Sequence, residues 1–180
     1  KNAKKVVKLN DYLFVSGTGN ASDIDMLQKI IAAELRLKHL KSKKRPTVKE
    51  AANLVAIMSF RNIRQFTTIP SIAGTLVAGF NEDGSCELYT VEPAGSISQV
   101  EDYDANFSSG MPFILGLLER QYKPEISVKE GVHLALEALK SSTQRDVGSG
   151  SGIDIFTITK EGIKQEVKQT IGSDYREDKK

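Results

Sequence analysis

The apolar positions along the chain follow two different periods, and the switches between them mark the predicted elements. Residues 6–9 and 13–16 are short apolar runs around a turn-type Asn-Asp pair, which predicts two strands. Apolar residues at 24–35 then recur three and four positions apart, which predicts an amphipathic helix. The basic stretch at 38–45, followed by Pro46, should end this helix.

The predicted helix starts carry a polar signal. In three of them, a side chain that accepts a hydrogen bond precedes an acidic residue by three positions, as in a capping box. These pairs are Ser22 with Asp25, Thr47 with Glu50, and Ser127 with Glu130. A further helix is predicted to begin near Pro112, because the N–H that proline lacks is not needed in a first turn.

The pattern gives paired strands alternating with paired helices, in the order ββ–αα–ββ–αα–ββ. Consecutive strands joined by short turns favour antiparallel sheets, and adjacent helices can cover a sheet face. The predicted fold class is therefore α+β rather than a doubly wound α/β fold. The later strand-like runs are residues 76–80, 87–91, 153–159 and 163–167.

Composition sets the size and the charge of the molecule. A chain of 180 residues with 39% hydrophobic residues has the length of one domain and can bury a sizeable core. The net charge of +2 gives no argument for binding nucleic acid or an anionic membrane. No apolar run approaches the roughly 18 residues of a membrane span. The basic start also lacks the apolar region and cleavage site of a secretory signal.

Cysteine and histidine usage narrows the chemistry. The single cysteine, Cys86, excludes a disulfide within the chain and fits a reducing compartment. One cysteine and two histidines are too few for a typical zinc site. We therefore expect a cytoplasmic protein without a metal or other cofactor.

Seven segments form an ordered set that extends over nearly the whole chain. They are residues 1–5 (KNAKK), 16–23 (SGTGNASD), 87–89 (ELY), 92–96 (EPAGS), 108–113 (SSGMPF), 116–119 (GLLE) and 145–154 (RDVGSGSGID). A single piece such as the SGSG run is a weak signal, whereas the ordered set is specific. With this set the chain resembles the β subunit of the proteasome core particle, a threonine peptidase family among the N-terminal nucleophile hydrolases.

The resemblance implies a four-layer αββα sandwich, in which two antiparallel sheets lie between helix pairs. Residues 1–170 would form this single domain, and residues 171–180 a charged, flexible tail. Family members begin with a threonine and about thirty residues of two strands before the part that matches residues 1–5. We therefore expect that the printed chain lacks the threonine and the first two strands, and that it is inactive in this form. Exposed core and unpaired strand edges would follow from their absence.

The resemblance also implies a threonine-type endopeptidase. In the family, a threonine hydroxyl attacks the peptide bond, its own α-amine acts as base through a water, and a lysine stabilises the alkoxide. Lys5 matches that lysine; Asp146, Ser149 and Ser109 match the groups that hold the amine. Gly19 matches the glycine whose backbone N–H binds the oxyanion. The alternative for Lys5 is an ordinary solvated lysine, and for Asp146 and Ser149 a local turn cap.

Four further residues match positions that bind substrate. Ala3, Gly17 and Asp25 correspond to the lining of the primary specificity pocket, and Ala21 to backbone pairing with an extended peptide. A glycine leaves the pocket deep and a carboxylate attracts cations, so we predict a trypsin-like preference for Lys or Arg before the cut. The alternative for Asp25 is a carboxylate at a helix N-terminus, where the macrodipole favours it.

Partners follow from the resemblance as well. Family members form heptameric rings, with two β rings between two α rings, and degrade unfolded polypeptides that a regulatory ATPase feeds into the chamber. The chain is thus expected to bind proteasome α subunits and other β subunits of an archaeal-type particle, with no nucleic acid and no membrane. Two alternatives remain: a non-catalytic structural β subunit, or a relative of the ATP-dependent bacterial protease with sixfold rings. The connector 66–75 has no assigned role.

Overall fold

The computed structural model describes residues 4–68 and 71–171 of the chain. The elements follow the predicted order, with one additional strand, β5, and one short 3-10 helix, η1. Ala3, and residues 172–180 of the predicted tail, lie outside the described residues. In chain order the elements are β1 (Val6–Asn10), β2 (Leu13–Gly19), α1 (Ala21–Ser42), α2 (Val48–Arg64), β3 (Ala73–Phe80), β4 (Cys86–Val91), β5 (Ile97–Val100), α3 (Met111–Gln121), α4 (Val128–Arg145), η1 (Val147–Ser149), β6 (Gly152–Thr159) and β7 (Gly162–Thr170).

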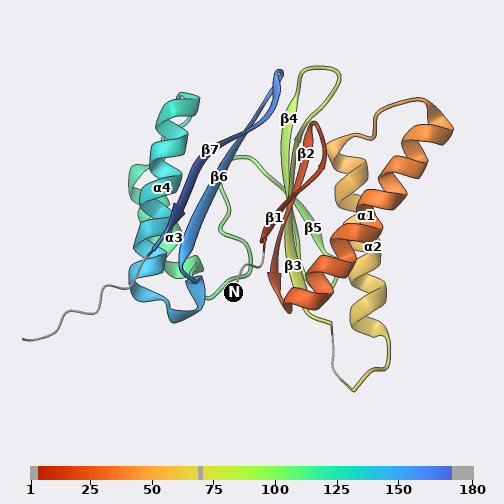
Figure 1. The fold of residues 1–180 in the computed structure, drawn as a ribbon, viewed down its shortest axis with the longest axis horizontal. Coiled ribbons are helices and arrows are strands. Elements are labelled where there is room, and N and C mark those ends of the chain that lie inside the picture. Colours follow the sequence, from red (N-terminus) through yellow and green to blue (C-terminus); the bar gives the residue numbers. More distant parts are fainter. Residues whose placement is uncertain (1–3, 69–70, 172–180) are drawn as a thin grey trace, which may run out of the picture.

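The elements are stacked in four layers (Figure 1). Helices α1 and α2 cover one face of a sheet whose strand order is β1-β2-β3-β4-β5. On the other side lies the β6–β7 hairpin, which α3 and α4 cover in turn. All strand pairs in the described part of the chain are antiparallel. The predicted α+β class and αββα layering are confirmed.

Strand β2 lies inside the larger sheet, and its end is fixed by pairing with β3. Gly17 is opposite Thr75, and Gly19 is opposite Ala73. The chain leaves β2 directly into α1, so the Gly-Thr-Gly segment is held between the sheet and the first turn of a helix.

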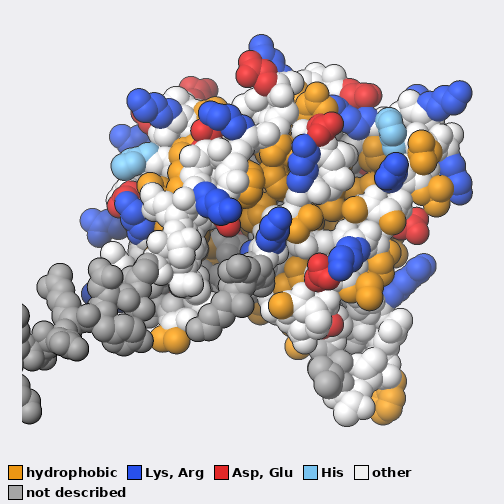
Figure 2. All heavy atoms as spheres, viewed as in Figure 1, with side chains coloured by type: hydrophobic (Ala, Val, Ile, Leu, Met, Phe, Trp, Pro, Cys, Tyr) orange, Lys and Arg blue, Asp and Glu red, His pale blue; other side chains and the backbone are white. Residues whose placement is uncertain are grey.

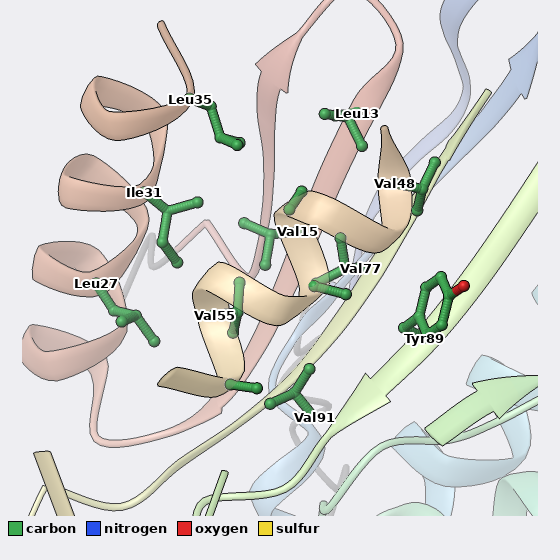
Figure 3. Close-up of a cluster of buried hydrophobic side chains, with 13 residues drawn as sticks. Leu13, Val15, Leu27, Ile31, Leu35, Val48, Val55, Val77, Tyr89 and Val91 are labelled. Atoms are coloured by element: carbon green, nitrogen blue, oxygen red, sulfur yellow. The ribbon is translucent and has the colours of Figure 1, made fainter. Parts of the chain in front are cut away.

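The main core lies between the five-stranded sheet and the α1–α2 pair (Figure 3). Val15 on β2 and Val77 on β3 point at Ile31 on α1 and Val55 on α2, and these four side chains have no exposed surface. Burying each of them stabilises the fold by about 1.5–3 kcal/mol relative to exposure. The apolar residues that alternate along the strands and those that recur every three to four positions along the helices are therefore the residues that meet in this core.

The two sheets meet through a smaller apolar contact. The rings of Phe14 on β2 and Phe156 on β6 are 4.8 Å apart at an angle of 53°, a favourable tilted arrangement. Beside them is a cavity of about 170 Å³, lined mainly by apolar side chains from both sheets, including Leu76, Leu88 and Ile158.

Two of the three predicted capping boxes are present. Thr47 and Ser127 accept hydrogen bonds from the backbone of Glu50 and Glu130, whose carboxylates accept from the backbone N–H groups of the two cap residues. The prediction for Ser22 was wrong. The N-cap of α1 is Asn20, whose Oδ1 accepts from the Ser22 N–H at 3.1 Å and the Ser22 hydroxyl at 2.7 Å.

Helix α1 is the longest helix in the part of the chain that the structure describes, yet it is not apolar enough to cross a bilayer. No other helix within residues 4–68 and 71–171 is both long and apolar enough to do so.

Candidate active site

The carboxylate of Asp146 is the centre of a hydrogen-bonded cluster. Asp146 follows the last residue of α4, and its Oδ1 accepts from the Gly148 N–H at 3.1 Å. Its Oδ2 accepts from the Ser149 hydroxyl at 2.5 Å and from the Ser109 hydroxyl at 2.8 Å. Three donors on one carboxylate strongly favour its charged form.

Two glycines allow the serines to come this close. A Cβ on Gly148 would lie 2.6 Å from the Ser109 Oγ. A Cβ on Gly110 would lie 2.1 Å from the Oγ of Ser142, a contact that no real Cβ makes. Gly110 and Gly148 therefore allow the start of α3 to pack closely against the segment that connects α4 with β6.

Ser142 belongs to this cluster, and the sequence analysis missed it. It lies on α4, is 2% exposed, and its Oγ is 2.5 Å from the Ser149 Oγ. Because Ser149 gives its single hydroxyl proton to Asp146, Ser142 must be the donor to Ser149. The sequence did offer a signal for Ser142, because it lies four residues before Asp146 on the inward face of the predicted helix.

Lys5 contributes positive charge to the same site. The pKa of Asp146 lies below its usual value, first because of the Ser149 hydrogen bond, then those of Ser109 and Gly148, and also because of the charge of Lys5. Desolvation opposes these effects. The ammonium is close enough to act on the carboxylate, but within the described residues the two groups form no ion pair shorter than 4.0 Å.

The end of β2 lies next to the backbone of Lys5. The Gly17 N–H donates to the Lys5 carbonyl oxygen at 2.9 Å. Gly19 has φ of +118°, and a Cβ there would lie 2.1 Å from the Ile72 carbonyl oxygen. A residue with a side chain cannot take this position without moving β3, so the glycine is required by the backbone. Ala21 is the exposed first residue of α1.

Gly17 and Asp25, which were expected to line a specificity pocket, do not form a cluster like that around Asp146. A Cβ on Gly17 would lie 2.4 Å from Ile24 Cγ2, so this glycine allows α1 to pack closely on β2. Asp25 is exposed, and its Oδ2 is 2.6 Å from the Lys29 ammonium. Among the described residues, neither of these lines the cavity between the sheets or the open groove on the α3–α4 layer.

The structure thus brings Ser109 to Asp146 and Ser149 across 37 residues of sequence, and the charge of Lys5 acts on Asp146 without a direct contact among the described residues. An ionised carboxylate with two hydroxyl groups and a nearby ammonium can hold an amine and orient a hydroxyl nucleophile. Within the described part of the chain, no group of three or more His, Cys, Asp or Glu residues could hold a metal ion.

Comparisons with known proteins show which family this sequence is similar to. The family model described as "Proteasome subunit" matches residues 1–158. The chain is 39% identical over 165 residues to "Proteasome subunit beta" of Nanoarchaeum equitans, covering 92% of this chain and 82% of that protein. It is 37% identical to "Proteasome subunit beta 2" of Pyrococcus abyssi, covering 92% and 76%. It is 34% identical to "Proteasome subunit beta 1" of Hyperthermus butylicus, covering 89% and 76%. The chain therefore belongs to the proteasome subunit family, among the β subunits.

Proposed function

We propose that this chain is a catalytic β subunit of a proteasome core particle, a threonine-type endopeptidase that cleaves unfolded polypeptides inside an enclosed chamber. The observation that carries the proposal is the hydrogen bonding of the Asp146 carboxylate. It accepts hydrogen bonds from the Ser109 and Ser149 hydroxyls, and the charge of Lys5 also helps to lower its pKa. Family membership supports assembly with α and β subunits in rings, and threonine protease activity is general in the family. A regulatory ATPase that delivers substrate, and a cytoplasmic location, complete the proposal.

The described residues would act around the hydroxyl and free amine of an N-terminal threonine. The positive charge of Lys5 would lower the cost of forming the alkoxide, because opposite charges attract. Asp146 and the hydroxyls of Ser109 and Ser149 would orient the α-amine of the threonine. This α-amine takes the proton of the threonine hydroxyl through a water and then gives it to the amine that leaves from the cleaved peptide bond. The backbone N–H of Gly19 would stabilise the oxyanion.

The test is the intact mass and N-terminal sequence of the protein isolated from its own cells, together with its peptidase activity. We expect a mature N-terminal threonine roughly thirty residues before Lys1, the distance that the family resemblance gives. Hydrolysis of peptides should stop when that threonine is changed to alanine. A natural protein without this threonine would instead be a structural β subunit, and the catalytic proposal would be wrong.

Ring symmetry separates the proteasome from the bacterial relative. We expect seven subunits in each ring of the assembled particle, counted in top views of negatively stained particles. Six subunits per ring would assign the chain to the ATP-dependent bacterial type.

The finer proposal is a preference for basic residues before the cut. The exposed Asp25 carboxylate near the start of α1 supports this preference, because it would attract a cationic side chain, although Lys29 partly compensates its charge. We expect the assembled enzyme to cleave Arg-ending fluorogenic peptides faster than Phe-ending ones, and Asp25→Asn to reduce that ratio about threefold to tenfold. Asp23→Asn, a change of the same kind in the first turn, should leave the ratio unchanged. A preference for Phe in the unmodified enzyme would contradict the proposal.

A further inference from the structure

Ser142 contacts the Asp146 cluster from the buried side of α4. Helix α4 packs on α3 and β6, and its buried residues are Ala138 and Ser142, which lie one turn apart. Figure 2 shows Lys, Arg, Asp and Glu side chains on the outer side of this helix layer, where they face solvent. A hydroxyl on the buried side has lost its hydrating water, so a polar group of the protein has to replace that water.

The group that replaces it is the hydroxyl of Ser149, whose Oγ lies 2.5 Å from the Ser142 Oγ. Ser149 donates its only hydroxyl proton to the Asp146 Oδ2, so Ser142 is the donor to Ser149. The hydrogen bonds therefore run in one direction, from Ser142 through Ser149 to the Asp146 carboxylate. Hydrogen bonds in such a chain strengthen one another, and the last of them ends on a charged acceptor.

The contact with Ser142 limits what the Ser149 oxygen can still bind. A hydroxyl oxygen has one covalent bond to carbon, one proton and two lone pairs. The proton of Ser149 points at Asp146, and one lone pair accepts from Ser142. One lone pair is left, in a direction that these two bonds determine. An N–H group that approaches Ser149 can therefore be held in a single orientation.

Gly110 provides the space for this pair of hydroxyls. A Cβ on Gly110 would lie 2.1 Å from the Ser142 Oγ and 2.7 Å from the Ser149 Oγ. The φ of Gly110 is −78°, a value that any residue can adopt. Glycine is therefore required at this N-cap of α3 for space and not for backbone freedom. The close approach of Ser142 to Ser149 thus depends on two positions of the sequence, one on each helix.

We propose that Ser142 is a positioning residue for the peptidase reaction: its donation to Ser149 leaves that hydroxyl one lone pair, which orients the α-amine of the N-terminal threonine. This inference rests on the proposed function. Ser142 acts through Ser149 and touches neither the substrate nor the attacking hydroxyl. An α-amine whose N–H is held by a directed bond keeps its own lone pair free for the proton of the threonine hydroxyl. Loss of Ser142 should therefore slow the chemical step and leave substrate binding unchanged.

The test is the peptide hydrolysis of the complete, assembled particle that carries Ser142→Ala. We expect kcat to decrease about threefold to tenfold, in line with the loss of one neutral hydrogen bond, while KM stays within about twofold. Thr143→Ala is the matched control, because it removes a hydroxyl from the next position of α4 that donates to the Lys140 carbonyl oxygen of the same helix at 3.1 Å. This control should have the kcat and KM of the unmodified particle.

Ser142→Cys separates donation from packing. A thiol fills the space of the hydroxyl but is a weaker donor. If donation is what positions Ser149, kcat should decrease from the unmodified particle to the cysteine variant and again to the alanine variant. If Ser142 only fills space, the cysteine variant will be as active as the unmodified particle. In a crystal structure of the alanine variant, we expect the Ser149 hydroxyl to occupy a second rotamer or to lie farther from Asp146.

The remaining outcomes each decide against a stated claim. In an active particle, equal kcat of Ser142→Ala and Thr143→Ala would overturn the role of Ser142 and leave the proposed function intact. A higher KM with unchanged kcat, or a Ser149 side chain that stays in place in the alanine variant, would overturn it as well. Inactivity of the unmodified particle would overturn the proposed function itself. If Ser142→Ala prevents assembly, the cysteine variant, which preserves packing, decides by its kcat alone.

Discussion

Changing Asp146 to asparagine should reduce kcat/KM of the assembled subunit for peptides roughly 100-fold to 10,000-fold, the contribution of acid–base catalysis, because the amine that acts as base loses the carboxylate that orients it. The carboxylate accepts from the Ser109 and Ser149 hydroxyls at Oδ2 and from the Gly148 N–H at Oδ1. An amide has one acceptor oxygen and two N–H donors, so it cannot satisfy all three donors, and it removes the negative charge on which the charge of Lys5 acts.

Asp154→Asn is the matched control for this experiment. Asp154 is an exposed carboxylate on β6 that accepts a hydrogen bond from the Gln165 side chain at 2.8 Å and has no hydrogen bond to the Asp146 cluster among the described residues. This variant should hydrolyse peptides at the unmodified rate. Equal activity of the Asp146 variant and this control would mean that the cluster is structural only, even if the particle is a peptidase.

The largest effect on stability is expected from Ile31→Ala. Ile31 is fully buried between α1, α2 and the five-stranded sheet. Truncating such a side chain leaves a cavity and costs about 2–5 kcal/mol. For a protein of this length each kcal/mol lowers Tm by about 2–4 °C, so thermal unfolding at fixed protein concentration should show a clear decrease.

The neighbouring residue gives a control of the same chemistry. Ile30→Ala removes the same atoms from the same helix, but Ile30 is 40% exposed on the outer side of α1. Its free energy of unfolding should change by less than about 1 kcal/mol, because little area leaves the core and alanine favours helix. Equal destabilisation by the two variants would contradict the placement of α1.

The sequence allowed most of the secondary structure to be predicted, because apolar period and local hydrogen-bonding signals coincide in this chain. The start of α1 is the informative exception. Ser22 and Asp25 fit a capping pattern, but the backbone turns at Gly19, which has a positive φ, and so Asn20 becomes the residue whose side chain meets the free N–H groups. A local pattern does not contain that turn.

Strand β5 could not be predicted, because its stability comes from its neighbour. Residues Ile97–Val100 form a short strand with two polar residues in the middle, a weak pattern by itself. The strand forms because a turn stabilised by the hydrogen bond from the Glu92 N–H to the Ser96 carbonyl brings it beside β4.

The candidate site shows the same limit more strongly. Ser109 and Asp146 are 37 residues apart in sequence, and neither periodicity nor composition indicates that their side chains meet at 2.8 Å. The resemblance to a family supplied that pairing. Ser142 lies outside the segments that carry the resemblance, and only its contact with Ser149 in the structure shows that it belongs to the cluster.

The order in which strands become neighbours has a consequence for how fast the chain folds. The β6–β7 hairpin closes over a turn of two residues, so this pairing can form within microseconds. Pairing of β2 with β3 must instead wait until the whole α1–α2 segment between them has been looped back. Loop closure of this length costs entropy before any contact compensates it, so we expect the central strands to dock in the rate-limiting step of refolding.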